Sequence, residues 1–230
     1  MSSEQLPLPV PPSPEERPLR LPDRVVPMQA TQVDAPFDDA GYFFEPWWPG
    51  IRAFALAERG RLRLQADGLA DADATFPEIG ELLGQLTEDG VALDGTLLVL
   101  DDDGRPDPAL LRARLDGDLD AGRPAYVASD LLWAGGEPVM RRSFRVRRRW
   151  LEALLHAGDR AMAGHGYAGD GTLVAEALAT LGIDGLSARQ LSARYRAGPA
   201  GAAWLRAPII PAEPRVRPTL ALILRLPLGD

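Results

Sequence analysis

Segment 51–66, IRAFALAERGRLRLQA, restricts the fold of this chain more than any other stretch, because two alternating segments flank Arg59-Gly60. Alternation over several residues predicts strands, and a short glycine-containing turn between them predicts a β-hairpin. Further apolar runs predict a strand pair within 91–107, a strand within 123–139, a strand at the end of 171–190, and strands at 202–210 and 219–228. The chain is therefore expected to build a sheet from hairpins.

Residues with helical spacing lie between these strands. They predict helices at 76–86, 108–115, 141–158 and in the segment that begins at 171. GHGYAG, 164–169, is expected to be a flexible glycine loop, because no clear strand precedes it. Since the elements do not follow strict β-α-β alternation, the sequence predicts an α+β protein with antiparallel sheets flanked by helices.

The ends of the chain differ in composition from its middle. Residues 1–27 are rich in proline and show neither helical nor alternating patterns, so they are expected to form a disordered tail. Residues 28–230 are expected to form one domain. No apolar run approaches the roughly 20 residues of a membrane span, and the amino terminus does not read as a secretory signal. We therefore expect a cytoplasmic protein without membrane contact.

All 25 basic residues of the chain are arginine, and lysine and cysteine are both absent. Arginine stays protonated at neutral pH and does not act as a nucleophile, so chemistry that needs a lysine amine or a cysteine thiolate is excluded. Two histidines, His156 and His165, make a transition-metal site of protein ligands unlikely to form, and no metal site is expected.

The net charge of −8 argues against a protein that coats nucleic acid. One segment, RRSFRVRRRW at 141–150, nevertheless concentrates positive charge. Two interpretations are open, a solvated helix face whose arginine stems cover apolar neighbours or a surface that contacts DNA or another anion. The candidate contacts are Arg141, Arg142, Arg145, Arg147, Arg148 and Arg149.

From residue 30 to 207 the sequence resembles the nucleotidyltransferase (adenylation) domain of bacterial ATP-dependent DNA ligases, the fold shared with mRNA-capping enzymes. The family's first motif reads Glu-x-Lys-x-Asp-Gly-x-Arg, and its lysine attacks the α-phosphate of ATP. EPWWPGIR, 45–52, keeps Glu45, Gly50 and Arg52. It places Trp47 at the lysine position and Pro49 at the aspartate position. The resemblance therefore implies the fold but removes the nucleophile.

The later motifs show a similar division between retained and replaced positions. Asp94-Gly95 is followed by Thr96 where the family has glutamate, and Ser129 stands where an aromatic residue stacks on adenine. Ala66 and Asp67 replace a serine and an arginine that contacts phosphate. In the fourth and fifth motifs, Asp184 and Gly185 remain close to the pattern, Arg189 and Arg206 replace lysines, and Pro208 replaces a further lysine.

This resemblance implies a ligase-like domain in which residues that build the fold survive and residues that serve the chemistry have changed. We expect no catalytic residues, no cofactor, and a binding or scaffolding role that involves DNA ends or end-joining proteins. Two alternatives remain: non-covalent ATP and Mg²⁺ binding, or adenylation on a residue other than lysine, and a pure protein-interaction module. The sequence does not fix the oligomeric state. No OB-fold domain is expected in residues 1–230.

The positions of Trp47 and Trp48 relative to the former nucleotide cleft can be interpreted in more than one way. They are expected either to fill part of the cleft or to form an aromatic platform beside it, with Pro49 fixing the turn. The competing interpretation is that both indoles are ordinary core residues.

Overall fold

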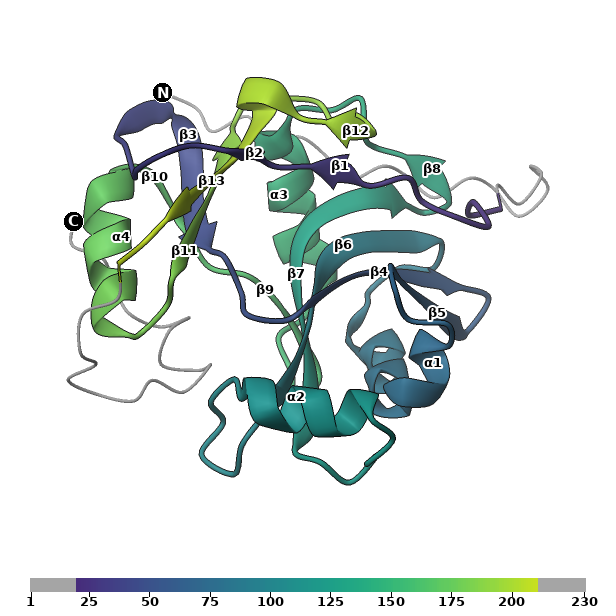
Figure 1. The fold of residues 1–230 in the computed structure, drawn as a ribbon. Helices are drawn as coiled ribbons and strands as arrows, with labels where there is room; N and C mark the ends of the chain where they lie inside the picture. Colours follow the sequence, from purple (N-terminus) through teal and green to yellow (C-terminus); the bar gives the residue numbers. More distant parts are fainter. Residues whose placement is uncertain (1–19, 211–230) are drawn as a thin grey trace.

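A computed structural model describes residues 20–210 as a mixed α and β structure built around two sheets (Figure 1). The first sheet has the order β5-β4-β6-β7-β8, with β9 beside β7, and the second has the order β10-β3-β11-β13-β2. Most neighbouring strands are antiparallel; the pairs β7–β9, β13–β2 and β1–β12 are parallel. The predicted α+β class is confirmed. The strands are β1 Met28–Gln29, β2 Thr31–Gln32, β3 Asp39–Pro46, β4 Ile51–Glu58, β5 Arg61–Ala66, β6 Val91–Leu100, β7 Arg123–Ala134, β8 Glu137–Pro138, β9 Ala161–Ala163, β10 Tyr167–Gly169, β11 Gly185–Gln190, β12 Gly198–Pro199 and β13 Trp204–Pro208.

The predicted hairpin is formed by β4 and β5. Arg59 and Gly60 have φ angles of 55° and 70°, which is the left-handed pair that a two-residue type I′ turn requires. On its other edge β4 pairs with β6, and β6 pairs with β7, so that Asp94 lies opposite both Phe54 and Asp130. The first sheet thus brings the candidate motif residues of three strands together.

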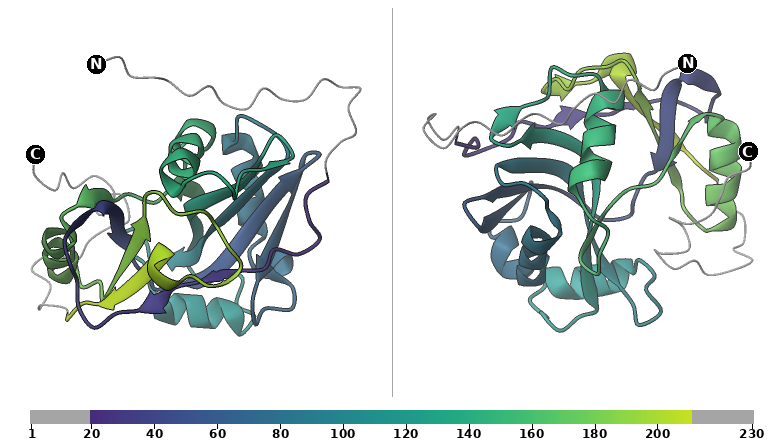
Figure 2. Two further views of the ribbon diagram at one scale, coloured as in Figure 1. Left: turned by 90° about the horizontal axis from the view of Figure 1, so that it is seen from above. Right: turned by 180° about the vertical axis from the view of Figure 1, so that it is seen from behind.

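Helices cover the outer faces of the two sheets (Figures 1 and 2). They are α1 Ala72–Thr75, the 3₁₀ helix η1 Pro77–Gln85, α2 Pro108–Leu115, α3 Phe144–Leu154, α4 Gly171–Thr180 and the short 3₁₀ turn η2 Gly201–Ala203. α3 packs on β7, and α4 packs on β3 and β11. The helix expected at 76–86 is present as a 3₁₀ helix, in keeping with the low α-helical propensity of Gly80 and Gly84.

Three groups of buried apolar side chains form the core. One lies between the first sheet and its helices and includes Phe76, Leu93 and Leu151. The second lies between α4 and the second sheet and includes Phe44, and the third joins the amino-terminal segment to β4, β6 and Trp204. The second and third groups connect the two sheets and so hold the cleft between them in place.

Residues 20–27, expected to belong to the disordered tail, instead lie along the hairpin β4–β5. Leu21 and Val25 are buried. The amide of Gln65 accepts a hydrogen bond from the backbone N–H of Val25 and donates one to its carbonyl, both at 2.8 Å. Apolar burial and this side-chain clamp fix the segment, and neither is visible in the local proline-rich composition.

Residues 1–19 and 211–230 lie outside the described part of the chain, and with them most of the predicted tail and the strand expected at 219–228. Between residues 20 and 210, no helix is long and apolar enough to cross a membrane.

Candidate nucleotide cleft

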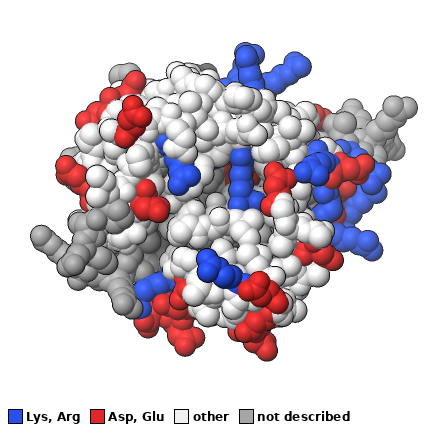
Figure 3. All heavy atoms as spheres, viewed as in Figure 1, with Lys and Arg blue, Asp and Glu red and all other residues white. Residues whose placement is uncertain are grey.

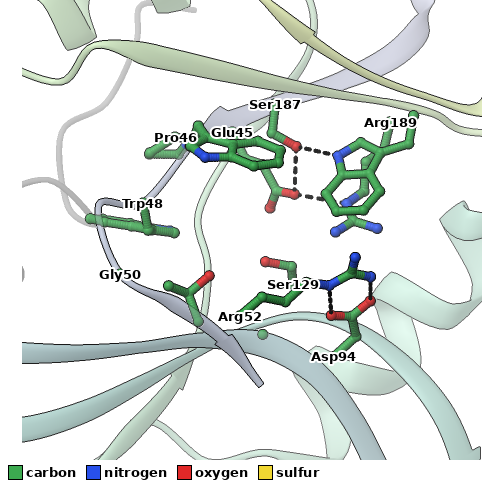
Figure 4. Close-up of a pocket in the computed structure, with 13 residues that line it drawn as sticks. Glu45, Pro46, Trp48, Gly50, Arg52, Asp94, Ser129, Ser187 and Arg189 are labelled. Carbon is green, nitrogen blue, oxygen red and sulfur yellow. Dashed lines mark hydrogen bonds and ion pairs between the residues drawn. The ribbon is translucent and has the colours of Figure 1, made fainter. Parts of the chain in front are cut away.

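A cleft opens where the two sheets meet (Figure 4). Its cavity volume is about 60 Å³, and its walls come from β3, β4, β6, β7, β11 and β13. The lining residues are Glu45, Pro46, Trp47, Trp48, Gly50, Arg52, Asp94, Gly95, Thr96, Ser129, Ser187, Arg189 and Trp204. Residues far apart in the sequence therefore share this small space.

A buried ionic network joins the two sheets behind the cleft. Arg189 on β11 donates to Glu45 on β3 at 3.0 Å and to Asp130 on β7 at 3.4 Å. Asp130 also accepts two hydrogen bonds of 2.8 Å from Arg147 on α3. All four side chains are buried, with exposed fractions of 4% or less. Breaking such a pair leaves an uncompensated buried charge, which is strongly destabilising.

Glu45 carries the one carboxylate oxygen in this network that has no partner within the described residues, Oε2. Burial raises the pKa of Glu45, and the nearby Arg189 and Arg148 guanidinium groups offset that rise in part. The carboxylate oxygen Oε1 accepts from both Ser187 and Arg189 (Figure 4). Glu45 on β3 is therefore tied to the side chains of the neighbouring strand β11 through a single oxygen.

A second ion pair closes the side of the cleft formed by the first sheet. Arg52 donates to both carboxylate oxygens of Asp94, at 2.9 and 2.6 Å. Its remaining Nη1 donates to the carbonyl of Met28, and the Tyr195 hydroxyl donates to Asp94 at 3.2 Å. Burial and the Asp94 charge raise the pKa of Tyr195, so this hydroxyl stays protonated at neutral pH. The guanidinium of Arg52 is thus engaged by protein groups on several sides.

Trp47, which the resemblance aligns with the motif lysine, lies against another aromatic ring. The ring of Trp47 stacks on Trp204, with centroids 5.6 Å apart and planes inclined by 28°. The guanidinium of Arg206 lies 4.5 Å from the Trp47 centroid, and those of Arg189 and Arg52 lie 4.1 and 4.7 Å from the Trp204 centroid. Guanidinium groups at these distances are attracted to an indole face.

The two adjacent tryptophans have separate environments. Trp48 is buried at 5% exposure in the core beneath α4 and also forms part of the cleft wall. Trp47 is half-buried and lies against Gly185, where an added Cβ would come within 2.8 Å of the Trp47 Cβ. Pro49 is exposed and does not line the cleft. The core interpretation therefore holds for Trp48, whereas Trp47 is placed beside the cavity.

The structure assembles some candidate positions in the cleft and separates others from it. Asp184 is exposed at the end of α4, and Asp67 pairs with Arg24 on the surface. Arg206 does not line the cleft, and its guanidinium lies over the ring of Trp47. Gly185, Ala66 and Pro208 do not line the cavity either. Eight motif positions do line it together: Glu45, Gly50, Arg52, Asp94, Gly95, Thr96, Ser129 and Arg189.

Two of the six candidate anion-contact arginines are buried rather than exposed, which corrects the expectation for them. Arg147 pairs with Asp130, and Arg148 pairs with Glu152 and donates to the carbonyl of Gly164. Both face the body of the protein, where apolar neighbours and carboxylates fix them. The other four, Arg141, Arg142, Arg145 and Arg149, are exposed.

Sequence reasoning missed three groups that line the cleft or contact its residues, namely the Ser187 hydroxyl in the wall and, beside Arg52 and Asp94, the Tyr195 hydroxyl and the Met28 backbone. Met28 and Tyr195 are separated by 167 positions and meet through a hydrogen bond of 3.0 Å. Ser187 accepts from the Trp204 indole N–H at 2.9 Å. No local pattern marks these residues, because each acquires its role only through strand pairing.

The cleft is small, and its two arginines are engaged by carboxylates. Small-molecule sites typically enclose about 300–1,000 Å³, well above the volume of this cavity. Arg52 is paired with Asp94, and Arg189 is paired with Glu45 and Asp130. Within residues 20–210, no three histidine, cysteine, aspartate or glutamate side chains are placed to hold a metal ion.

No family model matches the chain. Curated relatives do: it is 27% identical over 186 residues to the multifunctional non-homologous end joining protein LigD of Mycolicibacterium smegmatis. It is 29% identical over 188 residues to the LigD end joining DNA repair protein of Mycobacterium tuberculosis. A probable DNA ligase of Anaeromyxobacter dehalogenans is 33% identical over 166 residues. These alignments cover 80%, 80% and 68% of this chain, but 24%, 24% and 32% of the relatives.

Solved structures that resemble this chain also belong to DNA ligases. A mycobacterial DNA ligase D complexed with ATP and MES superposes with a TM-score of 0.69 at 28% identity, covering 80% of this chain and 60% of that one. The ligase domain of M. tuberculosis LigD gives a TM-score of 0.68 at 29% identity, covering 79% and 58%. The fold is thus that of a DNA ligase nucleotidyltransferase domain. This chain is a DNA ligase-like domain, homologous to the ligase domain of LigD and to other ATP-dependent DNA ligases.

Proposed function

We propose that this domain does not form a lysyl-AMP intermediate and acts as a binding or scaffolding module at DNA ends, in end joining or a related repair process. The observation that carries the proposal is the stack of Trp47 on Trp204 at the position where the ligase motif places its nucleophile. A sequence without lysine offers no substitute amine. Losing a covalent nucleophile costs many orders of magnitude in rate.

The retained ion pairs support a structural role for the former motif residues. Arg189 on β11 joins the two sheets by pairing with Asp130 on β7, while the pairs Arg52–Asp94 and Arg189–Glu45 each brace strands of one sheet, all without a nucleotide. Two of the relatives are LigD proteins of non-homologous end joining, which is the basis for placing the proposed partner at DNA ends.

Incubation with α-labelled ATP and Mg²⁺, followed by denaturing electrophoresis, tests the loss of the nucleophile directly. We expect no label on this protein under conditions that label an active DNA ligase run beside it. Acid-stable label on the protein would overturn the proposal and would show adenylation through a residue other than lysine. Mass spectrometry of the labelled peptide would then identify that residue.

A second candidate function is non-covalent nucleotide binding, favoured by the unpartnered Oε2 of Glu45 and by Ser129 in the cleft wall. Calorimetric titration with ATP, with and without Mg²⁺, separates the two candidates. The Trp47→Ala variant provides the informative comparison, because it enlarges the cleft. Binding by the wild-type chain at micromolar ATP would favour this second function.

A module that contacts only proteins is the third candidate. It predicts that neither duplex DNA nor ATP binds, whereas the proposed function predicts binding to nicked or blunt duplexes that weakens steeply as salt rises.

A further inference from the structure

Six exposed arginines gather where the start of α3 meets the loop that follows β11. Four are the exposed residues of the 141–149 segment, and two come from the loop 191–197. They are Arg141, Arg142, Arg145, Arg149, Arg194 and Arg196, and we call them the arginine patch. Within residues 20–210, no carboxylate forms an ion pair with any of these six guanidinium groups.

Backbone hydrogen bonds hold the two halves of the patch together. The N–H groups of Phe144 and Arg145 donate to the carbonyls of Ala193 and Leu191, at 2.8 and 3.0 Å. The N–H of Tyr195 donates to the carbonyl of Met140 at 2.9 Å. Arg147 binds both the Arg142 and the Ala193 carbonyls from below, at 2.6 and 3.2 Å. The patch therefore rests on a rigid base although its side chains reach into solvent.

The arginines of α3 divide between an inward and an outward face of the helix. Arg147 and Arg148 take the inward positions of α3, whereas Arg145 and Arg149, four residues apart, share its outward face. α3 lies on the far side of β7 from the view of Figure 1 and comes to the front in the right panel of Figure 2. None of the six arginines lines the cleft.

Acidic side chains gather on another part of the surface. The exposed acidic residues around α2, Asp102, Asp103, Asp116, Asp118 and Asp120, lie at the lower end of the molecule, where Figure 3 shows acidic side chains gathered. Screening limits the reach of these charges to about 8 Å at physiological salt. The net charge of −8 is therefore compatible with local attraction of an anion at the patch.

We infer that the arginine patch binds the phosphate backbone of a nucleic-acid duplex, on a face separate from the former nucleotide cleft. A protein partner is less suited to it, because stable protein interfaces bury an apolar centre. The exposed large apolar residues of the described chain, Val26, Leu115, Leu119, Leu173 and Ile210, all lie outside the patch. Backbone binding needs only positive charges at suitable spacing, and arginine binds phosphate through paired N–H donors.

The inference rests on the proposed function, in which the domain binds DNA, and adds where the duplex lies. The test is fluorescence anisotropy of a labelled blunt duplex with the full chain at several salt concentrations. Each phosphate contact contributes about 0.9 to the slope of log K against log salt. A triple variant, R141Q/R145Q/R194Q, is expected to lower the slope by about 2.7 and to weaken binding at low salt.

A matched control changes the net charge equally at exposed arginines elsewhere that have no ion pair, R59Q/R61Q/R112Q. It should leave the slope near that of the wild-type chain. The charge-preserving variant R141K/R145K/R194K should keep most of the slope, which a purely structural role of the arginine side chains would not produce. Urea unfolding of all three variants checks that the fold is intact.

The outcomes separate this inference from the proposed function. Equal loss of binding in the patch and control variants would overturn the patch while leaving a DNA-binding domain. Label from ATP on the protein would overturn the proposed loss of the nucleophile and leave the patch standing. No duplex binding at low salt, together with binding of poly-glutamate, would overturn the inference in favour of an acidic protein partner. A duplex RNA arm shows whether the sugar matters.

Discussion

The indole ring of Trp47 lies 5.6 Å from that of Trp204, nearly parallel to it, and so joins the turn after β3 to strand β13. Trp204 is buried at 4% exposure and donates to Ser187, whereas Trp47 is only half-buried. The inner ring is thus fixed by the core, and the outer ring rests on it beside the cavity. We therefore expect the two residues to contribute unequally to the stability of the fold and to the shape of the cleft.

Replacing the two tryptophans by alanine tests that inequality. We expect Trp204→Ala to lower the free energy of unfolding by about 3–5 kcal/mol, as for other buried aromatic residues. Trp47→Ala should cost less, because much of its ring is already in solvent. In a double-mutant cycle measured by urea denaturation, the coupling should be about 0.5–1.5 kcal/mol. A coupling near zero would show that the rings do not stabilise each other in solution.

Gly50 is the retained glycine of the first motif, and a substitution there tests whether the fold requires glycine at this position. An added Cβ would lie 2.2 Å from the Leu97 carbonyl and 2.7 Å from the side chains of Leu98 and Thr96. Gly50→Ala should therefore destabilise by at least about 1–3 kcal/mol. The matched control is Gly80→Ala, where no atom lies within 4 Å and a gain of about 0.5–1 kcal/mol is expected. Equal effects of both changes on the urea midpoint would contradict the steric argument.

The hairpin β4–β5, α2, α4 and the α+β class were predictable from sequence because their signals are local. Alternation around Arg59-Gly60 and the apolar spacing within 108–115 need no partner to be recognised. By contrast β10 forms within 164–169, where a loop is expected, and β9 forms just before it, where no clear strand is expected. The partners β3 and β7 supply the pairing that the local residues do not specify. The resemblance to ligases located the cleft, since it aligned residues that are scattered along the chain.

The remaining parts of the site depend on contacts between distant segments. The Met28–Tyr195 bond and the burial of Arg147 by Asp130 follow from how α3 and the amino-terminal segment pack. In a row of arginines such as 145–149, composition does not show which side chains turn inward. The packing of α3 on β7 determines which arginines form buried ion pairs and which belong to the exposed patch.

The network that joins the two sheets should fail when its central carboxylate is neutralised. Asp130→Asn leaves Arg147 and Arg189 buried without full compensation, and we expect a loss of about 3–5 kcal/mol in the free energy of unfolding. The exposed pair between Glu81 and Arg160 provides the comparison, since Glu81 is 62% exposed and Glu81→Gln should cost less than about 1 kcal/mol. Similar midpoints for the two variants in urea would mean that the buried network adds no stability.

Gln65 helps to hold residues 20–27 against the hairpin. Gln65→Ala removes two hydrogen bonds to the Val25 backbone, each worth about 0.5–1.5 kcal/mol. Hydrogen exchange at Leu21 and Val25 should therefore become faster while exchange in β6 stays slow. Gln32→Ala, at an exposed position of β2, serves as the control and should leave these rates unchanged.

Glu45 should give the stability of this domain a pH dependence of unusual sign for a carboxylate. Because burial raises its pKa in the folded state, the folded chain holds this proton at pH values where the unfolded chain has released it. The contribution of Glu45 is therefore greatest below its unfolded pKa, about 4.3, and is lost as pH rises through its folded pKa. Glu45→Gln removes the titration, so the stability of the wild-type chain relative to this variant should decline with rising pH across that interval. Urea unfolding of both proteins from pH 4 to 8 measures the difference, and a difference that grows with pH would show that pairing with Arg189 outweighs the cost of burial.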